Sequence, residues 1–218
     1  MISKRLGSIA SMVRRGSTVA DVGTDHGLLT IYLIQQNIAS KAIAADIAVS
    51  PAAVARKNIQ EAGLSEKIEV RVGDGLAPLS PDDAEDIVIA GMGGETIADI
   101  LEAAPWIKNA RYRLILQPMT HAEAVHAWLL QNGFTIGEER FLEDGGRSYV
   151  LLYAEYTAAP MVDDLVAIWR GGLSDEEGRP YFQKCAKHLD KCAAGCLARG
   201  EQQEAETLRD LAETLRNL

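Results

Sequence analysis

Five short runs of β-favouring apolar residues recur between residues 18 and 117, and this alternation constrains the fold most. The runs are TVADV (18–22), KAIAAD (41–46), IEVRV (68–72), DIVIA (86–90) and RLILQ (113–117). Stretches of helical length separate them, which is typical of β-α units that build a parallel sheet. Ser50-Pro51 and Gly63 predict the start and end of one such helix, and Thr120 and Gly133 those of another. The sequence therefore predicts a doubly wound α/β sheet.

The chain after the last of these helices departs from a purely parallel pattern. Residues 134–156, FTIGEERFLEDGGRSYVLLYAEY, contain two β-like runs joined by Asp144-Gly145-Gly146, which is a hairpin turn. The last two strands should therefore be antiparallel. Dinucleotide-binding sheets typically continue with a parallel sixth strand. The hairpin thus favours the methyltransferase variant of the fold, and S-adenosylmethionine over NAD.

The segment TAAP (157–160) predicts a boundary between a first domain, residues 1–158, and a second, residues 159–218. In the second domain a turn or short helix is expected near residues 162–172. Two series at helical spacing follow, separated by Gly200: Cys185, Leu189, Cys192 and Cys196, then Leu208, Leu211, Leu215 and Leu218. They predict a small α-helical hairpin with a coiled-coil-like seam. We expect the cysteines to be small apolar residues of that seam.

Charge is unevenly distributed along the chain. The formal net charge of −9 argues against a protein that coats nucleic acid generally. Two segments are nevertheless basic: residues 1–20, with Lys4, Arg5, Arg14 and Arg15, and residues 179–199, with Arg179, Lys184, Lys187, Lys191 and Arg199 against Asp190 alone. Lys184, Lys187 and Lys191 share one helical face. That face is either simply solvated or binds phosphate.

Targeting and metal-binding signals are not found. The segment MISKRLGSIASMVRRG has no apolar run of signal-peptide length, and no stretch approaches the roughly eighteen apolar residues of a membrane span. The three cysteines have neither a disulfide framework nor Cys-x-x-Cys spacing. We expect a cytoplasmic protein with reduced thiols, no metal and no membrane partner.

Glycines and carboxylates follow the first four predicted strands. They are Gly23 and Gly27 in DVGTDHG, Asp46 at the end of KAIAAD, Asp74 in GDGL, and Gly91, Gly93 and Gly94 in GMGGE. Glycines let a chain turn tightly beside a ligand, and a carboxylate after the second strand can accept both ribose hydroxyl protons. In a doubly wound sheet these loops converge on one crevice, which predicts a nucleotide-type cofactor site.

Three residues near this site have two interpretations each. Asp25 either caps the following helix or contacts the ligand, and these roles are compatible. His26 is either structural or contacts the methionine portion of the cofactor. Met92 belongs either to the core or to the surface that contacts the adenine ring.

The motifs DVGTDHGLL, GDGL, IAGMGGETI and LILQP occur in this order, with SKRL near the start and a helical hairpin at the end. Together they closely resemble the bacterial tRNA (adenine(22)-N(1))-methyltransferases over essentially the whole chain. The resemblance implies a Rossmann-like class I fold and methyl transfer from S-adenosylmethionine to ring nitrogen 1 of an adenine in the D-arm region of tRNA. The implied cofactor set is Arg5, Gly23, Asp25, His26, Gly27, Asp46, Ile47, Asp74, Gly75, Gly91 and Met92. The expected substrate set is Arg14, Arg15, Gly93, Gly94, Gln117, Pro118, Lys184, Lys187 and Lys191.

Two places depart from the family pattern. Leu28 and Thr30 stand where many relatives have an aromatic residue and a proline, and Met119 stands where they have an asparagine. These departures bear on the substrate more than on the cofactor.

Ring nitrogen 1 carries a lone pair in neutral adenine, so methylation needs alignment and desolvation rather than deprotonation. Asp25 is the candidate catalytic residue, because a carboxylate can stabilise the cationic product. The alternatives are a methyltransferase for another RNA or a small molecule, an NAD-linked oxidoreductase, and a non-catalytic RNA-binding module. We expect a monomer or a weak homodimer.

Overall fold

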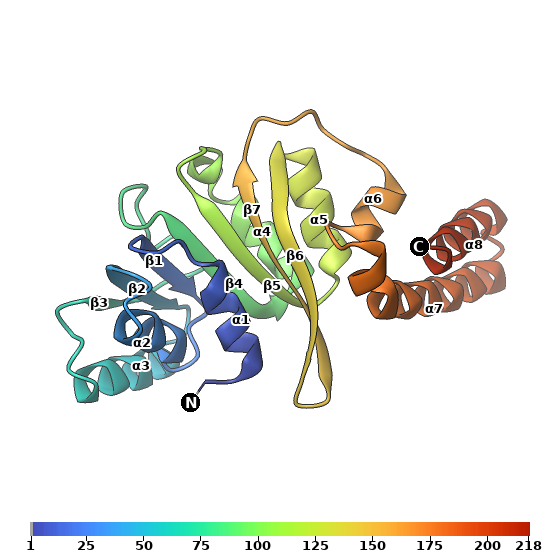
Figure 1. Cartoon of the computed structure of the whole chain (residues 1–218). Helices are drawn as coiled ribbons and strands as arrows, with labels where there is room; N and C mark the ends of the chain where they lie inside the picture. Colours follow the sequence, from blue (N-terminus) through green and yellow to red (C-terminus); the bar gives the residue numbers. More distant parts are fainter. Residues whose placement is uncertain (1) are drawn as a thin grey trace.

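The computed structural model describes residues 2–218, which form seven strands and eight α-helices (Figure 1). The strands are β1 (Thr18–Val22), β2 (Lys41–Asp46), β3 (Ile68–Val72), β4 (Asp86–Gly93), β5 (Arg113–Thr120), β6 (Phe134–Asp144) and β7 (Arg147–Tyr156). The helices are α1 (Lys4–Met12), α2 (Leu28–Gln35), α3 (Val49–Glu61), α4 (Gly94–Glu102), α5 (Ala122–Gln131), α6 (Leu165–Arg170), α7 (Asp175–Arg199) and α8 (Gln202–Arg216), with one 3-10 turn, η1 (Pro105–Ile107).

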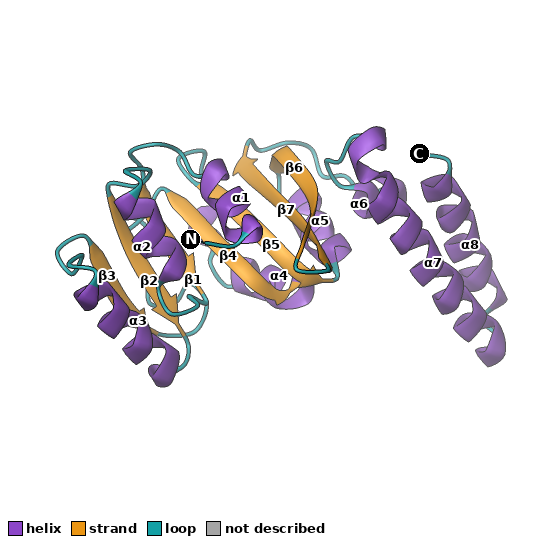
Figure 2. Cartoon of the chain, turned by 60° about the horizontal axis from the view of Figure 1, so that its bottom comes forward, coloured by secondary structure: helices purple, strands orange, loops and turns teal. Residues whose placement is uncertain are grey.

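All seven strands form one sheet in the order β3-β2-β1-β4-β5-β7-β6. The first five are parallel, and β7 runs antiparallel to both of its neighbours, β5 and β6. Each central strand alternates its side chains between two cores: in β4, Ile87 and Ile89 face one core and Val88 the other. Helices α4 and α5 cover the first face and α1, α2 and α3 the second (Figure 2). The predicted doubly wound sheet with a reversed last strand is confirmed.

The β6-β7 turn has the geometry predicted for it. Gly145 and Gly146 have φ of 59° and 75°, and Asp144 pairs with Arg147 across the two-residue loop. Positive φ at both central positions is typical of a type I′ turn, which matches the twist of a hairpin.

Two predicted helix starts are wrong, although the helices themselves are present. Helix α3 begins after Ala48 rather than at Ser50, because the Asp46 carboxylate accepts a hydrogen bond from the Ala48 amide at 2.8 Å. Thr120 belongs to β5 and does not cap α5. The residue before α5 is His121, which takes a left-handed conformation with φ of 52°.

Helices α7 and α8 form the predicted antiparallel hairpin, and they lie beyond the β6 edge of the sheet (Figure 1). The buried seam contains Cys185, Leu189, Ala193 and Cys196 from α7, with Leu211 and Leu215 from α8. Cys192 was expected in this seam, but it is only half-buried and lies beside His188, with Sγ 3.5 Å from Nε2. Ala193 takes its place, because the next residue along a helix turns toward a different face.

A buried ion pair fastens the C-terminal helices to the sheet. His126 of α5 and Glu139 of β6 have fully buried side chains, with Nε2 2.9 Å from Oε1. The other ring nitrogen of His126 donates to the Ile168 carbonyl of α6 at 2.8 Å, and Glu139 accepts from the Gly172 amide. Burial disfavours the charged imidazole, but the Glu139 charge and these hydrogen bonds together raise the pKa of His126. We call this group the His126 clasp.

Among the helices of residues 2–218, none combines the length and apolar composition that crossing a lipid bilayer requires.

Candidate functional site

The loops that follow β1, β2 and β4 meet at the carboxyl edge of the sheet, as predicted. The amides of Gly23 and Thr24 both donate to the Ala45 carbonyl of β2, each at 2.9 Å. Gly23 has a φ of 75°, which favours glycine, and the terminal methyl of Met92 occupies the space where a side chain would lie. Half-buried Met92 thus packs against the first loop, at the base of the crevice.

The first loop has an unusual backbone that exposes its polar side chains. His26 and Gly27 have φ of 58° and 73° in succession, and Asn58 of α3 donates to the His26 carbonyl at 2.9 Å. Gly27 precedes α2, which has no side-chain cap. The capping interpretation of Asp25 is therefore wrong. Its carboxylate instead lies 3.3 Å from His26 Nε2, and both side chains are exposed at the crevice, by 70% and 49%.

The ends of β2 and β3 offer a carboxylate and an apolar rim. Asp46 uses one oxygen to bind the Ala48 amide and keeps the other available to a ligand. Beside it Ile47 and Val49 are 66% and 72% exposed, and Val72 is 43% exposed. Exposed aliphatic side chains grouped around a carboxylate suit a ligand with a flat apolar ring joined to a sugar. Ile47 was predicted; Val49 and Val72 were missed, since ordinary apolar positions carry no site signal.

The loop after β3 contributes the predicted GDGL residues. Asp74 is exposed at the crevice, and Gly75 has φ of 50°. A Cβ on Gly75 would lie 3.0 Å from Ile100, so this loop packs closely against helix α4.

Arg5 reaches the site from α1. Its guanidinium donates to Gln117 Oε1 at 2.6 Å and lies over the Tyr149 ring, 5.7 Å from the centroid. Its backbone amide donates to Asp144 of the β6-β7 turn. Gln117, at the end of β5, is completely buried. Gln117 was expected to bind substrate, but it is buried and its amide bonds to Arg5 and to the Pro118 carbonyl, so it positions Arg5 instead. Tyr149 of β7 is an additional neighbour that the sequence did not identify.

A buried acid that was not predicted from the sequence lies beneath the first loop. Asp21 of β1 is 5% exposed and accepts a hydrogen bond from Thr24 Oγ1 at 2.7 Å. Burial raises the pKa of its carboxyl to about 6, against the opposing effects of the Thr24 bond and the Arg5 charge. The only signal in the sequence was an aspartate within an otherwise apolar strand, directly before the glycine loop.

The GMGG segment differs from the open loop that was expected. Gly91 to Gly93 continue β4, with two irregularities in its pairing with β5. Gly91 is exposed and faces Arg5, and Gly93 lies beside Thr120. Gly94 is buried, and a Cβ there would overlap the His121 carbonyl. Gly94 therefore serves the close approach of two loops and does not line the substrate site.

The two N-terminal arginines, Arg14 and Arg15, lie away from the predicted substrate site. Arg14 binds the buried Asp86 carboxylate through Nε and its own amide, at 2.6 and 2.7 Å, and donates to the carbonyls of Glu85 and Arg111. These partners lie at the amino ends of β4 and β5, opposite the crevice. Arg15 is an exposed residue at the same edge. Arg14 is thus a structural residue, and neither arginine contacts the crevice.

A pocket connects the end of β5 to the C-terminal helices. Its cavity has a volume of about 290 Å³. Its walls, which define what we call the α7 pocket, are residues 118–123, Phe141, residues 148–150, Trp169, and Tyr181, Lys184, Cys185 and His188 of α7. Pro118 and Lys184, both predicted substrate residues, therefore share one pocket. Lys187 and Lys191 lie further along α7 and are exposed.

The family departures lie at accessible positions. Leu28 is 43% exposed at the start of α2, and Met119 is 40% exposed in the wall of the α7 pocket. Thr30 is buried, and its hydroxyl donates to the Gly27 carbonyl at 3.0 Å. Leu28 and Met119 can therefore contact a substrate, whereas Thr30 supports the loop.

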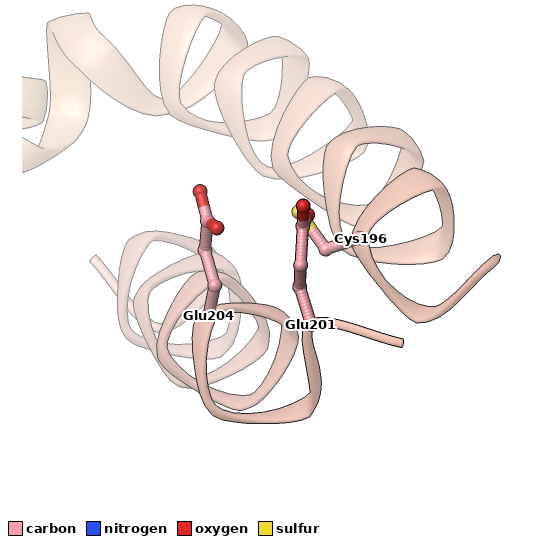
Figure 3. A group of neighbouring side chains, drawn as sticks. All are labelled: Cys196, Glu201 and Glu204. Carbon is pink, nitrogen blue, oxygen red and sulfur yellow. The ribbon is translucent and has the colours of Figure 1, made fainter. Parts of the chain in front are cut away.

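One group of side chains in residues 2–218 has the composition of a metal site. Cys196, Glu201 and Glu204 lie around the turn between α7 and α8, with ligand atoms within 4.8 Å of one another (Figure 3). Burial, followed by the Glu204 charge, raises the pKa of the Cys196 thiol, which opposes the thiolate that a metal needs. Glu201 is already paired with Arg199 at 2.6 Å. Both features oppose metal binding.

Comparison with known proteins places this geometry in context. The family described as a methyltransferase domain matches residues 2–152. The chain is 33% identical to the tRNA (adenine(22)-N(1))-methyltransferase of Bacillus subtilis (strain 168), over 98% of this chain and 94% of that protein. The crystal structure of the B. subtilis M1A22 tRNA methyltransferase TrmK matches with a TM-score of 0.88 at 30% identity, over 99% of both chains.

A third relative was solved with a ligand. Streptococcus pneumoniae Sp1610, a candidate tRNA (m1A22) methyltransferase in complex with S-adenosyl-L-methionine, matches with a TM-score of 0.82 at 34% identity, over 99% of this chain and 100% of its own. The similarity to these proteins extends through α7 and α8 as well as through the sheet. The chain therefore belongs to the tRNA (adenine(22)-N(1))-methyltransferase family.

Proposed function

We propose that this protein transfers the methyl group of S-adenosylmethionine to ring nitrogen 1 of adenine 22 in tRNA. The observation that carries the proposal is the similarity to an enzyme of this name over 98% of the chain, C-terminal helices included. The exposed Asp25, His26 and Ile47 at the carboxyl edge of the sheet support the cofactor, because ligands of doubly wound sheets bind at that edge.

In this proposal the cofactor lies across the ends of β1, β2 and β3. Asp46 accepts the ribose hydroxyls, and Ile47 with Asp74 and Gly75 holds the adenine. Gly23, Asp25, His26 and Gly27 line the methionine portion, and Gly91 with Met92 lies beside the methyl group. Arg5 closes the site from α1 and can bind the cofactor carboxylate.

The reaction is a direct displacement. The lone pair of ring nitrogen 1 attacks the methyl carbon, the carbon–sulfur bond breaks, and its electron pair returns to sulfur. The positive charge moves from the sulfonium to the adenine, so no base is required. The exposed Asp25 carboxylate can stabilise the charge that grows on the adenine. Because the target nitrogen lies on a pairing edge, the base must leave its stack before it reaches the crevice.

The two parts of the chain would divide the work. Residues 1–158 bind the cofactor and the target base, and residues 159–218 bind the tRNA backbone. The second role is supported by three exposed lysines of α7: Lys184, Lys187 and Lys191. None of them takes part in the ion pairs found within residues 2–218, so their charges are available to phosphates. Lys57 of α3, by contrast, pairs with Glu61. With few cations on a protein of net charge −9, tRNA binding should be strongly salt-dependent. A tRNA substrate agrees with the expected cytoplasmic location, and we propose that the protein acts as a monomer or weak homodimer.

The test is to incubate the protein with an unmodified tRNA transcript and methyl-labelled S-adenosylmethionine, digest the RNA, and identify the labelled nucleoside by mass spectrometry. We expect 1-methyladenosine from a transcript with adenine at position 22, and no labelled nucleoside from a matched transcript with guanine there. Label in any other nucleoside, or none, would refute the proposal.

A further inference from the structure

The α7 pocket lies on the far side of β5 from the methyl-transfer crevice. Near the end of β5, Pro118 pairs with Met92 of β4, so the wall of the α7 pocket lies next to a residue of the proposed cofactor site. The opposite wall of the α7 pocket comes from Tyr149 of β7, Trp169 of α6 and helix α7. The pocket therefore lies beside the proposed methyl-transfer site, one strand further along the sheet.

The walls of this pocket suit a nucleotide, which has a flat base and a negatively charged phosphate. Trp169 and His188 present neighbouring rings, with centroids 6.2 Å apart and planes inclined by 31°. Aromatic faces of this kind stack on nucleobases of any sequence. The one carboxylate in the wall, Glu123, already pairs with His121 at 2.9 Å. Lys184 has no such partner within residues 2–218 and can bind a phosphate.

The volume limits the occupant to a small group. A cavity of about 290 Å³ lies at the lower end of the range for ligand pockets, roughly 300–1,000 Å³, so it admits one nucleotide and excludes a helical segment. When the target adenine leaves its stack, the bases beside it lose a stacking partner. A second aromatic surface next to the crevice would restore that contact.

We propose that the α7 pocket binds the base of a nucleotide directly adjacent to the target adenine, with Trp169 and His188 as its stacking surface and Lys184 bound to its phosphate. This inference rests on the proposed tRNA substrate. It assigns Trp169 a positioning role: the residue fixes the displaced RNA strand and never contacts the transferred methyl group.

The test combines protein variants with tRNA transcripts that each lack one base: the target, its 5′ neighbour or its 3′ neighbour. Binding is measured by fluorescence anisotropy for the wild type, Trp169→Ala, the matched variant Trp169→Phe, and His188→Ala. We expect Trp169→Ala to weaken binding of intact tRNA about tenfold, and Trp169→Phe to retain wild-type binding, because a stacked base contributes a factor of that order. His188→Ala, a change at an exposed residue, should weaken binding about threefold and serves if Trp169→Ala fails to fold.

The decisive result is the coupling between the two kinds of change. Loss of one neighbouring base should weaken binding to the wild type but leave binding to Trp169→Ala almost unchanged, while S-adenosylhomocysteine affinity stays constant in all variants. If the effects of the protein change and of each neighbouring abasic site multiply, or if the coupling is with the target base, the inference is overturned. Wild-type protein that failed to form 1-methyladenosine in a parallel assay would instead refute the proposed function.

Discussion

The two edges of the sheet use the same kinds of residue for opposite purposes. At the amino edge the charged groups are paired: Arg14 with the buried Asp86 at 2.6 Å, and Arg113 with Glu155 at 2.8 Å, where the Arg113 guanidinium also covers the Tyr153 ring. At the carboxyl edge Asp25 is 70% exposed and Ile47 is 66% exposed. These two ion pairs satisfy their charges within the fold, whereas the carboxyl edge leaves Asp25 and Ile47 available to a ligand.

The contrast shows that side chains available to a ligand gather at the carboxyl edge. Parallel strands direct their following loops to one edge, so ligand-binding groups can gather there while acids at the other edge pair with arginines. Asp86 and Asp21 illustrate the difference, since both are buried acids at strand ends, yet only Asp86 has an arginine bonded to it. Changes at the amino edge should alter stability alone, and changes at the carboxyl edge should alter binding.

The largest expected effect is at the amino edge. Arg14→Ala leaves the fully buried Asp86 without its ion-pair partner, and should lower the free energy of unfolding by about 3 to 4 kcal/mol, the lower part of the range for a broken buried pair, because Arg14 itself is partly exposed. Urea denaturation measures this. Arg15→Ala, one residue along and exposed, is the matched control and should change stability little. Altered affinity for S-adenosylmethionine in Arg14→Ala would contradict the separation of the two edges.

Asp21 should show that the carboxyl edge sacrifices stability for binding. Its pKa in the folded protein is raised to about 6 from 3.8, so between these values the folded state binds more protons than the unfolded state. The free energy of unfolding therefore falls as pH rises through that range, by up to about 3 kcal/mol. Asp21→Asn should remove this pH dependence and be more stable than the wild type at pH 7.

The same substitution should weaken cofactor binding, because the ionised carboxylate attracts the positive charges of S-adenosylmethionine. Titration calorimetry across pH 5 to 8 measures both proteins. In the wild type the affinity should rise as Asp21 ionises near pH 6, and in Asp21→Asn that rise should disappear. If Asp21→Asn is less stable than the wild type at pH 7, or keeps the pH dependence of cofactor affinity, then Asp21 stabilises the fold as Asp86 does and does not serve binding.

Asp46→Ala tests the open edge directly. Loss of a charged acceptor for two ribose hydroxyls should raise the Kd of S-adenosylmethionine by tenfold or more, at about 1.5–3 kcal/mol for a hydrogen bond to a charged group. Stability should change by less than about 1 kcal/mol, because the substitution removes a single exposed hydrogen bond to the Ala48 amide. Asp46→Asn keeps an acceptor for that amide and controls for the local turn. Equal affinity for S-adenosylmethionine in the wild type and both variants would show that Asp46 does not bind the ribose.

The smallest effect is expected on α7. Lys184→Glu with Lys187→Glu should raise the KM for tRNA about fivefold and reduce its salt dependence, without a change in cofactor affinity. Lys57→Glu with Lys67→Glu makes the same change in net charge near α3 and is the matched control. If both pairs raise the KM equally, the effect reflects overall charge and α7 has no specific role.

The strands were predictable because their apolar runs and glycine turns are local signals. The sequence located β1, β2 and β3 to the residue, and the hairpin turn at Gly145 and Gly146. The errors arose where tertiary contacts decide the local structure. Thr120 has the chemistry of a cap, yet it continues β5, because the packing of Gly94 on His121 sets where α5 begins.

The site was predictable to the extent that its residues follow strands in the sequence. Gly23, Asp46 and Asp74 could be assigned to one edge from topology alone. Arg14 could have been excluded by the same argument, because it precedes the first strand and so belongs to the amino edge; its charge alone suggested a substrate role. Asp21 could not be recognised as buried. The α7 pocket could not be predicted from the sequence. Its walls come from β5, β7, α6 and α7, and their contacts depend on how the C-terminal helices pack on the sheet.

The His126 clasp has a consequence for how a long RNA is handled. The ring and the carboxylate together hold α6 and Gly172 against α5 and β6, so the position of α7 relative to the sheet is fixed rather than hinged. If Lys184 binds the tRNA backbone, as we propose, the clasp keeps that contact at a set distance from the carboxyl edge of the sheet. Only an adenine at the matching distance along the tRNA would then reach the methyl group.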